Sequence, residues 1–123
     1  LLEGVTYEIL LNLKHLEKFG ISPEKLYATG GGASSEKWLQ IKADILNRPV
    51  ISLAAKEAGA CGTCMLASVA MGIYTGVYEA AKHFVREKKT FTPNGAYAKI
   101  YEKRYNTYEK IYPAVKEILK GEI

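Results

Sequence analysis

Three consecutive glycines separate a short strand-like run from a helical pattern. The run is Lys25 to Thr29, and the glycines are Gly30 to Gly32. Glycine adopts backbone conformations that other residues avoid and lets the backbone approach a ligand closely. Ser34 or Ser35 is suited to begin the next helix, whose first N–H groups lack partners within the helix. A turn of this kind favours phosphate binding, although a purely structural turn explains three glycines equally well.

The glycine spacing excludes two common nucleotide-binding fingerprints. No Gly-Lys-Ser/Thr follows the glycines, so the turn is not a P-loop, and the G-x-G-x-x-G spacing of dinucleotide-binding folds is absent. The turn therefore has to be interpreted with the elements around it.

Hydrophobic periodicity predicts an α/β order of helix, strand, helix, strand and three further helical segments. Small residues in the third helix predict that it is buried, and Pro113 predicts a kink or a split in the last helix. A sheet of two strands is too small to be stable, so we expect missing strands upstream or from another chain. The predicted helices are 1–19, 34–46, 60–74, 77–85 and 96–119; the strands are 25–29 and 50–53, and 88–95 is a loop.

The 123 residues carry a formal net charge of +4, and the basic surplus lies in the C-terminal third. Tyrosines at helical spacing accompany these charges, which favours packing over nucleic-acid binding. Two cysteines are too few for a secreted disulfide framework, and the longest apolar stretch is too short and too interrupted to span a bilayer. We therefore expect a cytoplasmic protein with neither nucleic-acid nor membrane partners. Because Leu1 lies in a helical pattern without an initiator methionine, we also expect a piece of a longer protein.

A longer pattern surrounds the glycine turn. Ala28 to Gln40 is followed by Ala43 to Val50, then by Glu57 and the small-residue run Ala58 to Ala67. This succession of a G-G-G-A turn, a Trp-containing helix, an A-D-x-x-x-x-P-V run and a small-residue helix resembles the C-terminal signature of FGGY carbohydrate kinases, with the xylulokinase-like branch as the nearest match. The resemblance extends over nearly the whole chain, including the tyrosines of its tail.

The resemblance implies part of the C-terminal RNase H-like domain of an actin-like ATPase fold, with few strands, many helices and a C-terminal helical tail. Residues 1–87 would belong to the nucleotide side of that domain, and residues 88–123 would form the tail packed on it. The chain would bind part of ATP through Gly31, Gly32 and Ala33. Glu36 occupies a position where some members place an adenine-contacting asparagine, so its carboxylate would accept from adenine or cap the helix.

The resemblance also implies transfer of the γ-phosphoryl group of ATP to a sugar hydroxyl, with a pentulose such as xylulose as the expected acceptor. Such transfer needs a metal ion and a carboxylate that takes the hydroxyl proton. The family's catalytic aspartate and most of its Mg²⁺ site lie upstream, so we expect no catalytic and no metal-binding residue here and no activity of the chain alone. Asp44 falls in the structural A-D run. We expect a homo-oligomer or pairing with the missing part.

Two other functions compete with this hypothesis. Cys61 and Cys64 have the C-x-x-C spacing of dithiol proteins, although cysteines in a small-residue helix also pack as small apolar side chains. A non-catalytic interaction module would instead pair with another chain through the exposed edge of its incomplete sheet. Trp38 could stack on adenine, but its stripe with Ile41 and Ile45 favours packing.

Overall fold

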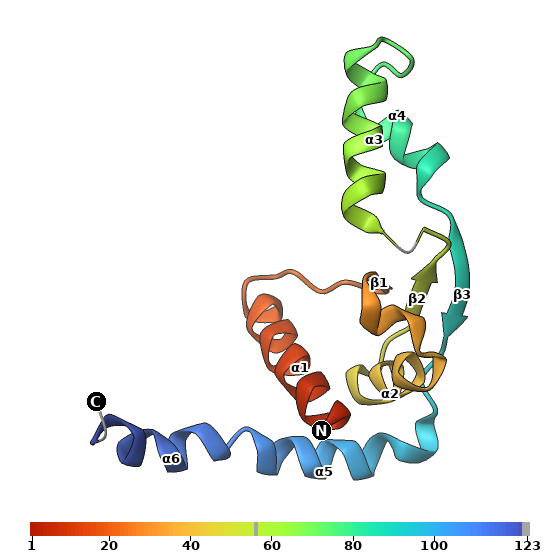
Figure 1. Ribbon diagram of the computed structural model, residues 1–123. Helices are drawn as coiled ribbons and strands as arrows, with labels where there is room; N and C mark the ends of the chain where they lie inside the picture. Colours follow the sequence, from red (N-terminus) through yellow and green to blue (C-terminus); the bar gives the residue numbers. More distant parts are fainter. Residues whose placement is uncertain (56, 122–123) are drawn as a thin grey trace.

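The computed structural model describes residues 1–55 and 57–121 and shows a helix-rich α/β fold around a three-stranded sheet (Figure 1). The strands are β1 (Leu26–Ala28), β2 (Val50–Leu53) and β3 (Glu87–Phe91), in the order β1-β2-β3. β1 and β2 are parallel, whereas β2 and β3 are antiparallel. The predicted fold class, with few strands and many helices, is confirmed.

The third strand, β3, was not predicted from the sequence. The expected loop 88–95 contains most of β3, and the strand comes from downstream rather than from upstream or from another chain. Only Phe91 of its five residues is buried, so the sequence lacks the alternating apolar pattern of a strand. β3 forms because its backbone pairs with β2, and its charged residues protect a sheet edge.

Two helices, α1 (Leu2–Lys18) and α2 (Glu36–Leu46), pack against each other beside the sheet. α1 ends where predicted: Gly20 has a φ of 80°, and the N–H of Ile21 donates to the Leu16 carbonyl at 3.1 Å. This is the Schellman ending that glycine favours. α2 begins at Ser35, whose hydroxyl accepts from the Trp38 N–H, and ends at the left-handed Asn47.

The core lies between the two helices and the sheet. Leu39 and Ala43 of α2 and Val50 of β2 are at most 2% exposed. Phe91 of β3 belongs to the same buried cluster, so all these elements share one core. The sheet and helices α1, α2 and α5 are called the body below.

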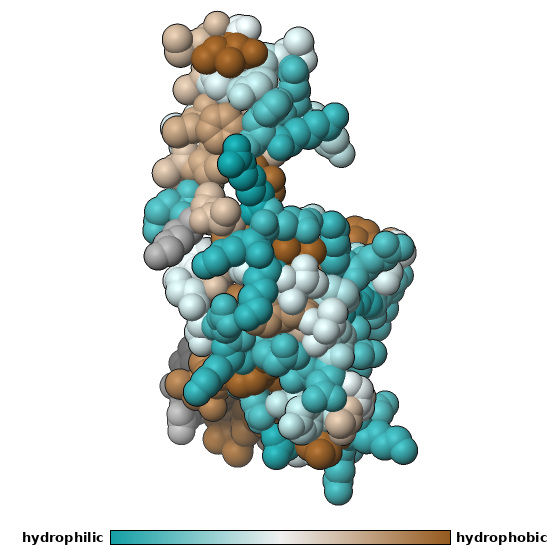
Figure 2. All heavy atoms as spheres, turned by 90° about the vertical axis from the view of Figure 1, so that its right-hand side faces the viewer, coloured by the Kyte–Doolittle hydropathy of each residue, from teal (hydrophilic) through white to brown (hydrophobic). Residues whose placement is uncertain are grey.

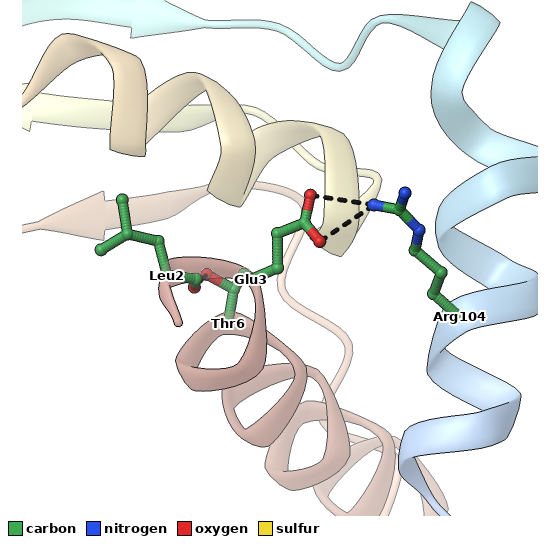
Figure 3. Close-up of polar contacts among 4 residues, drawn as sticks. All are labelled: Leu2, Glu3, Thr6 and Arg104. Carbon is green, nitrogen blue, oxygen red and sulfur yellow. Dashed lines mark hydrogen bonds and ion pairs between the residues drawn. The ribbon is translucent and has the colours of Figure 1, made fainter.

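The tail is split into α5 (Ala98–Tyr108) and α6 (Ile111–Lys120), as Pro113 predicted. α5 packs on α1 and α2, and its Tyr105 is 1% exposed. Figure 3 shows the polar link between the two ends of the chain: the guanidinium of Arg104 donates to both carboxylate oxygens of Glu3, at 3.1 and 2.9 Å. In the same helical turn, Thr6 donates to the Leu2 carbonyl.

Helices α3 (Ala58–Ala70) and α4 (Val77–Phe84) form a hairpin, here called the arm, that projects away from the body (Figure 1). The prediction that the small-residue helix is buried is wrong for this chain, because Ser68 is the one residue of α3 classed as buried. Its only substantial contact partner among the described elements is α4. Figure 2 shows apolar side chains gathered along the arm, above a more hydrophilic sheet region.

No helix among the described residues is both long enough and apolar enough to cross a membrane.

Candidate functional site

A cleft of about 190 Å³ lies where β1 and β2 end. In open α/β sheets, ligands bind outside the carboxyl ends of the parallel strands, because loops and helix starts converge there. One wall comes from the segment after β1, and the other comes from the end of β2 and the start of β3. The lining residues are Ala28, Thr29, Gly30, Ala33, Ser34, Glu36, Leu39, Ser52, Leu53, Ala54, Ala55 and Lys88.

The glycine turn forms a short 3-10 helix, Gly31–Ser34, before α2 begins. Gly30 has a φ of 77°, a conformation that other residues rarely adopt, so the chain needs glycine there to enter the turn. The first hydrogen bond of the turn runs from the Ala33 N–H to the Gly30 carbonyl at 3.0 Å. The N–H groups of Gly31 and Gly32 precede that bond, so the turn itself gives them no acceptor.

Gly32 has a packing reason to be glycine. A Cβ atom added to it would lie 2.7 Å from the Trp38 ring. The indole N–H of Trp38 donates to Thr6 at 3.4 Å, and the Lys42 ammonium lies 4.2 Å from the ring centroid. Trp38 therefore packs under the glycine turn and links α2 to α1, in agreement with the packing alternative of the sequence analysis. Burial at this position lowers the pKa of Lys42.

Gly31 has no comparable packing reason. A Cβ atom there would meet no atom within 4 Å, and its φ is not positive. The structure of the chain therefore leaves open space beside Gly31, and a ligand approaching the backbone would use that space.

Glu36 begins α2 and faces β3. Its carboxylate accepts from the Lys89 ammonium at 2.6 Å, and this hydrogen bond holds the pKa of the Glu36 carboxyl below its ordinary value. The charges of Lys89 and Lys88 act in the same direction. Glu36 is therefore an ionised, acceptor-only group at the edge of the cleft.

Of the four predicted nucleotide-binding residues, Ala33 and Glu36 line the cleft. Gly31 and Gly32 belong to the same turn but are not among its lining residues. Ser52 and Lys88, on the opposite wall, were not predicted from the sequence as site residues. No local signal marked Ser52 or Lys88, because the pairing of β2 with β3 brings them to the cleft.

Asp44 has a structural role, as expected. Its buried carboxylate accepts from the Gln40 side chain and from the Asn94 N–H, both at 2.8 Å. It thereby ties α2 to the segment after β3. Asp44 does not line the cleft.

Cys61 and Cys64 are free thiols on the arm, at the fourth and seventh positions of α3 rather than at its start. A thioredoxin-like dithiol would instead lie at a helix N-terminus, so the position of the two cysteines does not support the dithiol hypothesis. Glu57 precedes α3 as expected but makes no side-chain capping bond. Among residues 1–55 and 57–121, no three His, Cys, Asp or Glu side chains are grouped closely enough to hold a metal ion.

A family model for the C-terminal domain of the FGGY family of carbohydrate kinases matches residues 1–71. The chain belongs to this family. The resemblance noted in the sequence is thereby confirmed, and the cleft with its glycine turn lies in the C-terminal domain of an FGGY carbohydrate kinase.

Curated relatives include the xylulose kinase of Bacillus subtilis, 31% identical over 118 residues, which cover 96% of this chain and 24% of the relative. The autoinducer-2 kinase of Escherichia coli K12 is 32% identical over 102 residues, covering 82% of this chain and 19% of the relative. The chain thus spans about a quarter or less of the length of the curated relatives it matches.

Solved structures agree with these matches. A ligand-bound xylulose kinase from Lactobacillus acidophilus superposes with a TM-score of 0.84 at 27% identity, covering 94% of this chain and 23% of that one. A gluconate kinase from the same organism gives a TM-score of 0.82 at 27% identity, covering 93% and 23%. These relatives and solved structures are named for different substrates, so similarity to them does not name the sugar.

Proposed function

We propose that the chain forms the nucleotide side of an ATP-dependent FGGY carbohydrate kinase. The observation that carries the proposal is the cleft at the carboxyl ends of β1 and β2, with the glycine turn on one wall. The turn gives the backbone N–H groups of Gly31 and Gly32 no acceptor, so these groups would donate to the nucleotide, and Ala33 lines the cleft beside them. The ionised Glu36 accepts from a donor on the nucleotide, such as the adenine amino group.

The complete kinase transfers the γ-phosphoryl group of ATP in line to a sugar hydroxyl. Such transfer depends on positioning, on charge neutralisation by a metal ion and on a base for the hydroxyl proton. The described residues do not fit a Mg²⁺ site, since they offer no cluster of acidic or histidine ligands. Asp44 is committed to structural hydrogen bonds. We therefore assign nucleotide positioning to this chain and assign metal binding and proton removal to the upstream part of the kinase.

The proposed acceptor is a pentulose such as xylulose. The support is similarity: several relatives with about 31% identity are named xylulose kinases. Within this proposal, the nucleotide domain of residues 1–87 also includes the rest of β3, up to Phe91, and the helical tail on it begins after that strand rather than at residue 88. The chain works with the rest of the kinase or as a homo-oligomer and is inactive alone.

Ligand-observed NMR with millimolar ADP tests the proposal directly. We expect saturation transfer from the chain to the adenine protons, and we expect Gly31→Val to abolish it by filling the space beside the turn. Gly62→Val is the matched control, because Gly62 lies on the arm and a Cβ there also meets nothing within 4 Å. An absence of signal with the unsubstituted chain would refute nucleotide binding by the chain.

A further inference from the structure

A β-bulge places a lysine at the mouth of the cleft. Ser52 pairs with Lys89, but the next residue of β2, Leu53, pairs with Glu87. β3 therefore carries one extra residue, Lys88, that has no direct partner on β2. Bulges of this kind redirect side chains and are frequent beside functional sites.

Two adjacent lysines thus have different environments. Lys89 is engaged by Glu36 and does not line the cleft. Lys88 lines the cleft, and its charge is close enough to lower the pKa of Glu36. In the described part of the chain, the Lys88 ammonium makes no hydrogen bond or ion pair.

The local charge leaves a net positive group for a ligand. Glu36 and Lys89 neutralise each other at 2.6 Å, so the charge of Lys88 is not cancelled by that pair. Asp44, the other described carboxylate of α2, is buried and bonded to Gln40 and Asn94. Glu87 precedes Lys88, but its carboxylate is bound by Lys25 and Tyr27. An exposed, flexible ammonium at a cleft mouth suits an anionic ligand group.

We propose that Lys88 is a positioning residue that binds a phosphate of the nucleotide, across the cleft from the glycine turn. This inference rests on the proposed function, because it assumes that the cleft accepts an adenine nucleotide. It adds a contact on the wall formed by β3. The cleft would then hold the nucleotide from both sides, with backbone N–H groups on one wall and an ammonium on the other.

The test compares ADP with adenosine, which lacks phosphate, in metal-free buffer. Dissociation constants are measured by NMR titration for the unsubstituted chain and for Lys88→Met. We expect Lys88→Met to weaken ADP binding about tenfold, the effect of one lost hydrogen bond to a charged group. Adenosine binding should not change. Lys88→Arg, which keeps the charge, should restore most of the ADP affinity.

Lys99→Met is the matched charge control, because Lys99 is exposed on α5 and is not among the residues that line the cleft. If it weakens ADP binding as much as Lys88→Met does, the effect is general attraction and the proposal is wrong. Equal losses for ADP and adenosine, or no loss for either, would also overturn it. If the unsubstituted chain binds neither ligand, the proposed function fails, and with it the inference that depends on it.

Discussion

The body and the arm use their apolar residues in opposite ways. In the body, Leu39 is 1% exposed and packs with residues from both helices and the sheet. On the arm, Leu66 is 61% exposed and Met71 is 78% exposed. The body therefore has a core of its own, whereas the arm presents apolar surface of the kind that marks an interaction site. The cleft belongs to the body, so its geometry rests on the better-packed part of the chain.

The largest expected difference between the body and the arm is in the unfolding free energy lost when a leucine is truncated. Leu39→Ala removes a fully buried side chain, and such changes cost about 2–5 kcal/mol of unfolding free energy through lost burial and a residual cavity. Leu66→Ala on the arm should change the unfolding free energy by less than about 0.5 kcal/mol, as exposed substitutions do. Urea denaturation followed by circular dichroism measures both. Similar losses for the two variants would show that Leu66 is buried in solution and that the two regions do not differ in this way.

Glycine-to-alanine substitutions should have opposite effects on stability in the two regions. Gly32→Ala places a Cβ 2.7 Å from the Trp38 ring, so the ring or the turn must shift, at a cost of about 1–3 kcal/mol. Gly62→Ala meets nothing within 4 Å in the interior of α3, where alanine is favoured over glycine by about 1 kcal/mol.

Hydrogen exchange reports both effects. Amides of α2 should exchange faster in Gly32→Ala, while amides of α3 should exchange more slowly in Gly62→Ala. Slower exchange in α2 of the Gly32→Ala variant would mean that Trp38 does not pack under the turn.

Local patterns predicted the helices and the turn because their causes are local. The helical repeat, Gly20 and Pro113 mark where α1 ends and where the tail divides. The glycine turn and Ser35 likewise predicted how α2 begins. These features depend on neighbouring residues, which a sequence shows directly.

The missed features depend on partners distant in sequence. β3 is rich in exposed charged residues and becomes a strand because β2 offers a pairing edge. The bulge at Lys88 depends on the pairing register of β2 and β3, so no local sequence motif could predict it. The prediction that α3 is buried was wrong because it assumed a partner that the described elements do not provide. Small residues predict close packing, but α4 is the only substantial partner of α3 among the described elements.

The smallest expected effect compares one carboxyl from each region. Hydrogen bonding to Lys89, supported by its charge, lowers the pKa of Glu36 in the body. On the arm, hydrogen bonds from the Thr75 hydroxyl and N–H, at 2.6 and 2.8 Å, lower the pKa of Glu79. A lowered folded-state pKa stabilises the fold above the unfolded-state pKa. Each contribution is therefore lost as the pH falls from the ordinary value of 4.5 through the folded-state pKa.

Salt should distinguish these two carboxyls, because ion pairs between exposed groups are screened, whereas hydrogen bonds from neutral donors are affected much less. NMR titration at low and at high salt should show the pKa of Glu36 rising toward its ordinary value while the pKa of Glu79 changes little. Lys89→Met should raise the pKa of Glu36 at low salt and leave the pKa of Glu79 unchanged. Thr75→Val should raise the pKa of Glu79 and leave the pKa of Glu36 unchanged. If the pKa of Glu36 changes neither with salt nor in Lys89→Met, the ion pair between Glu36 and Lys89 does not form in solution. Glu36 would then be free to turn toward the ligand without first leaving Lys89.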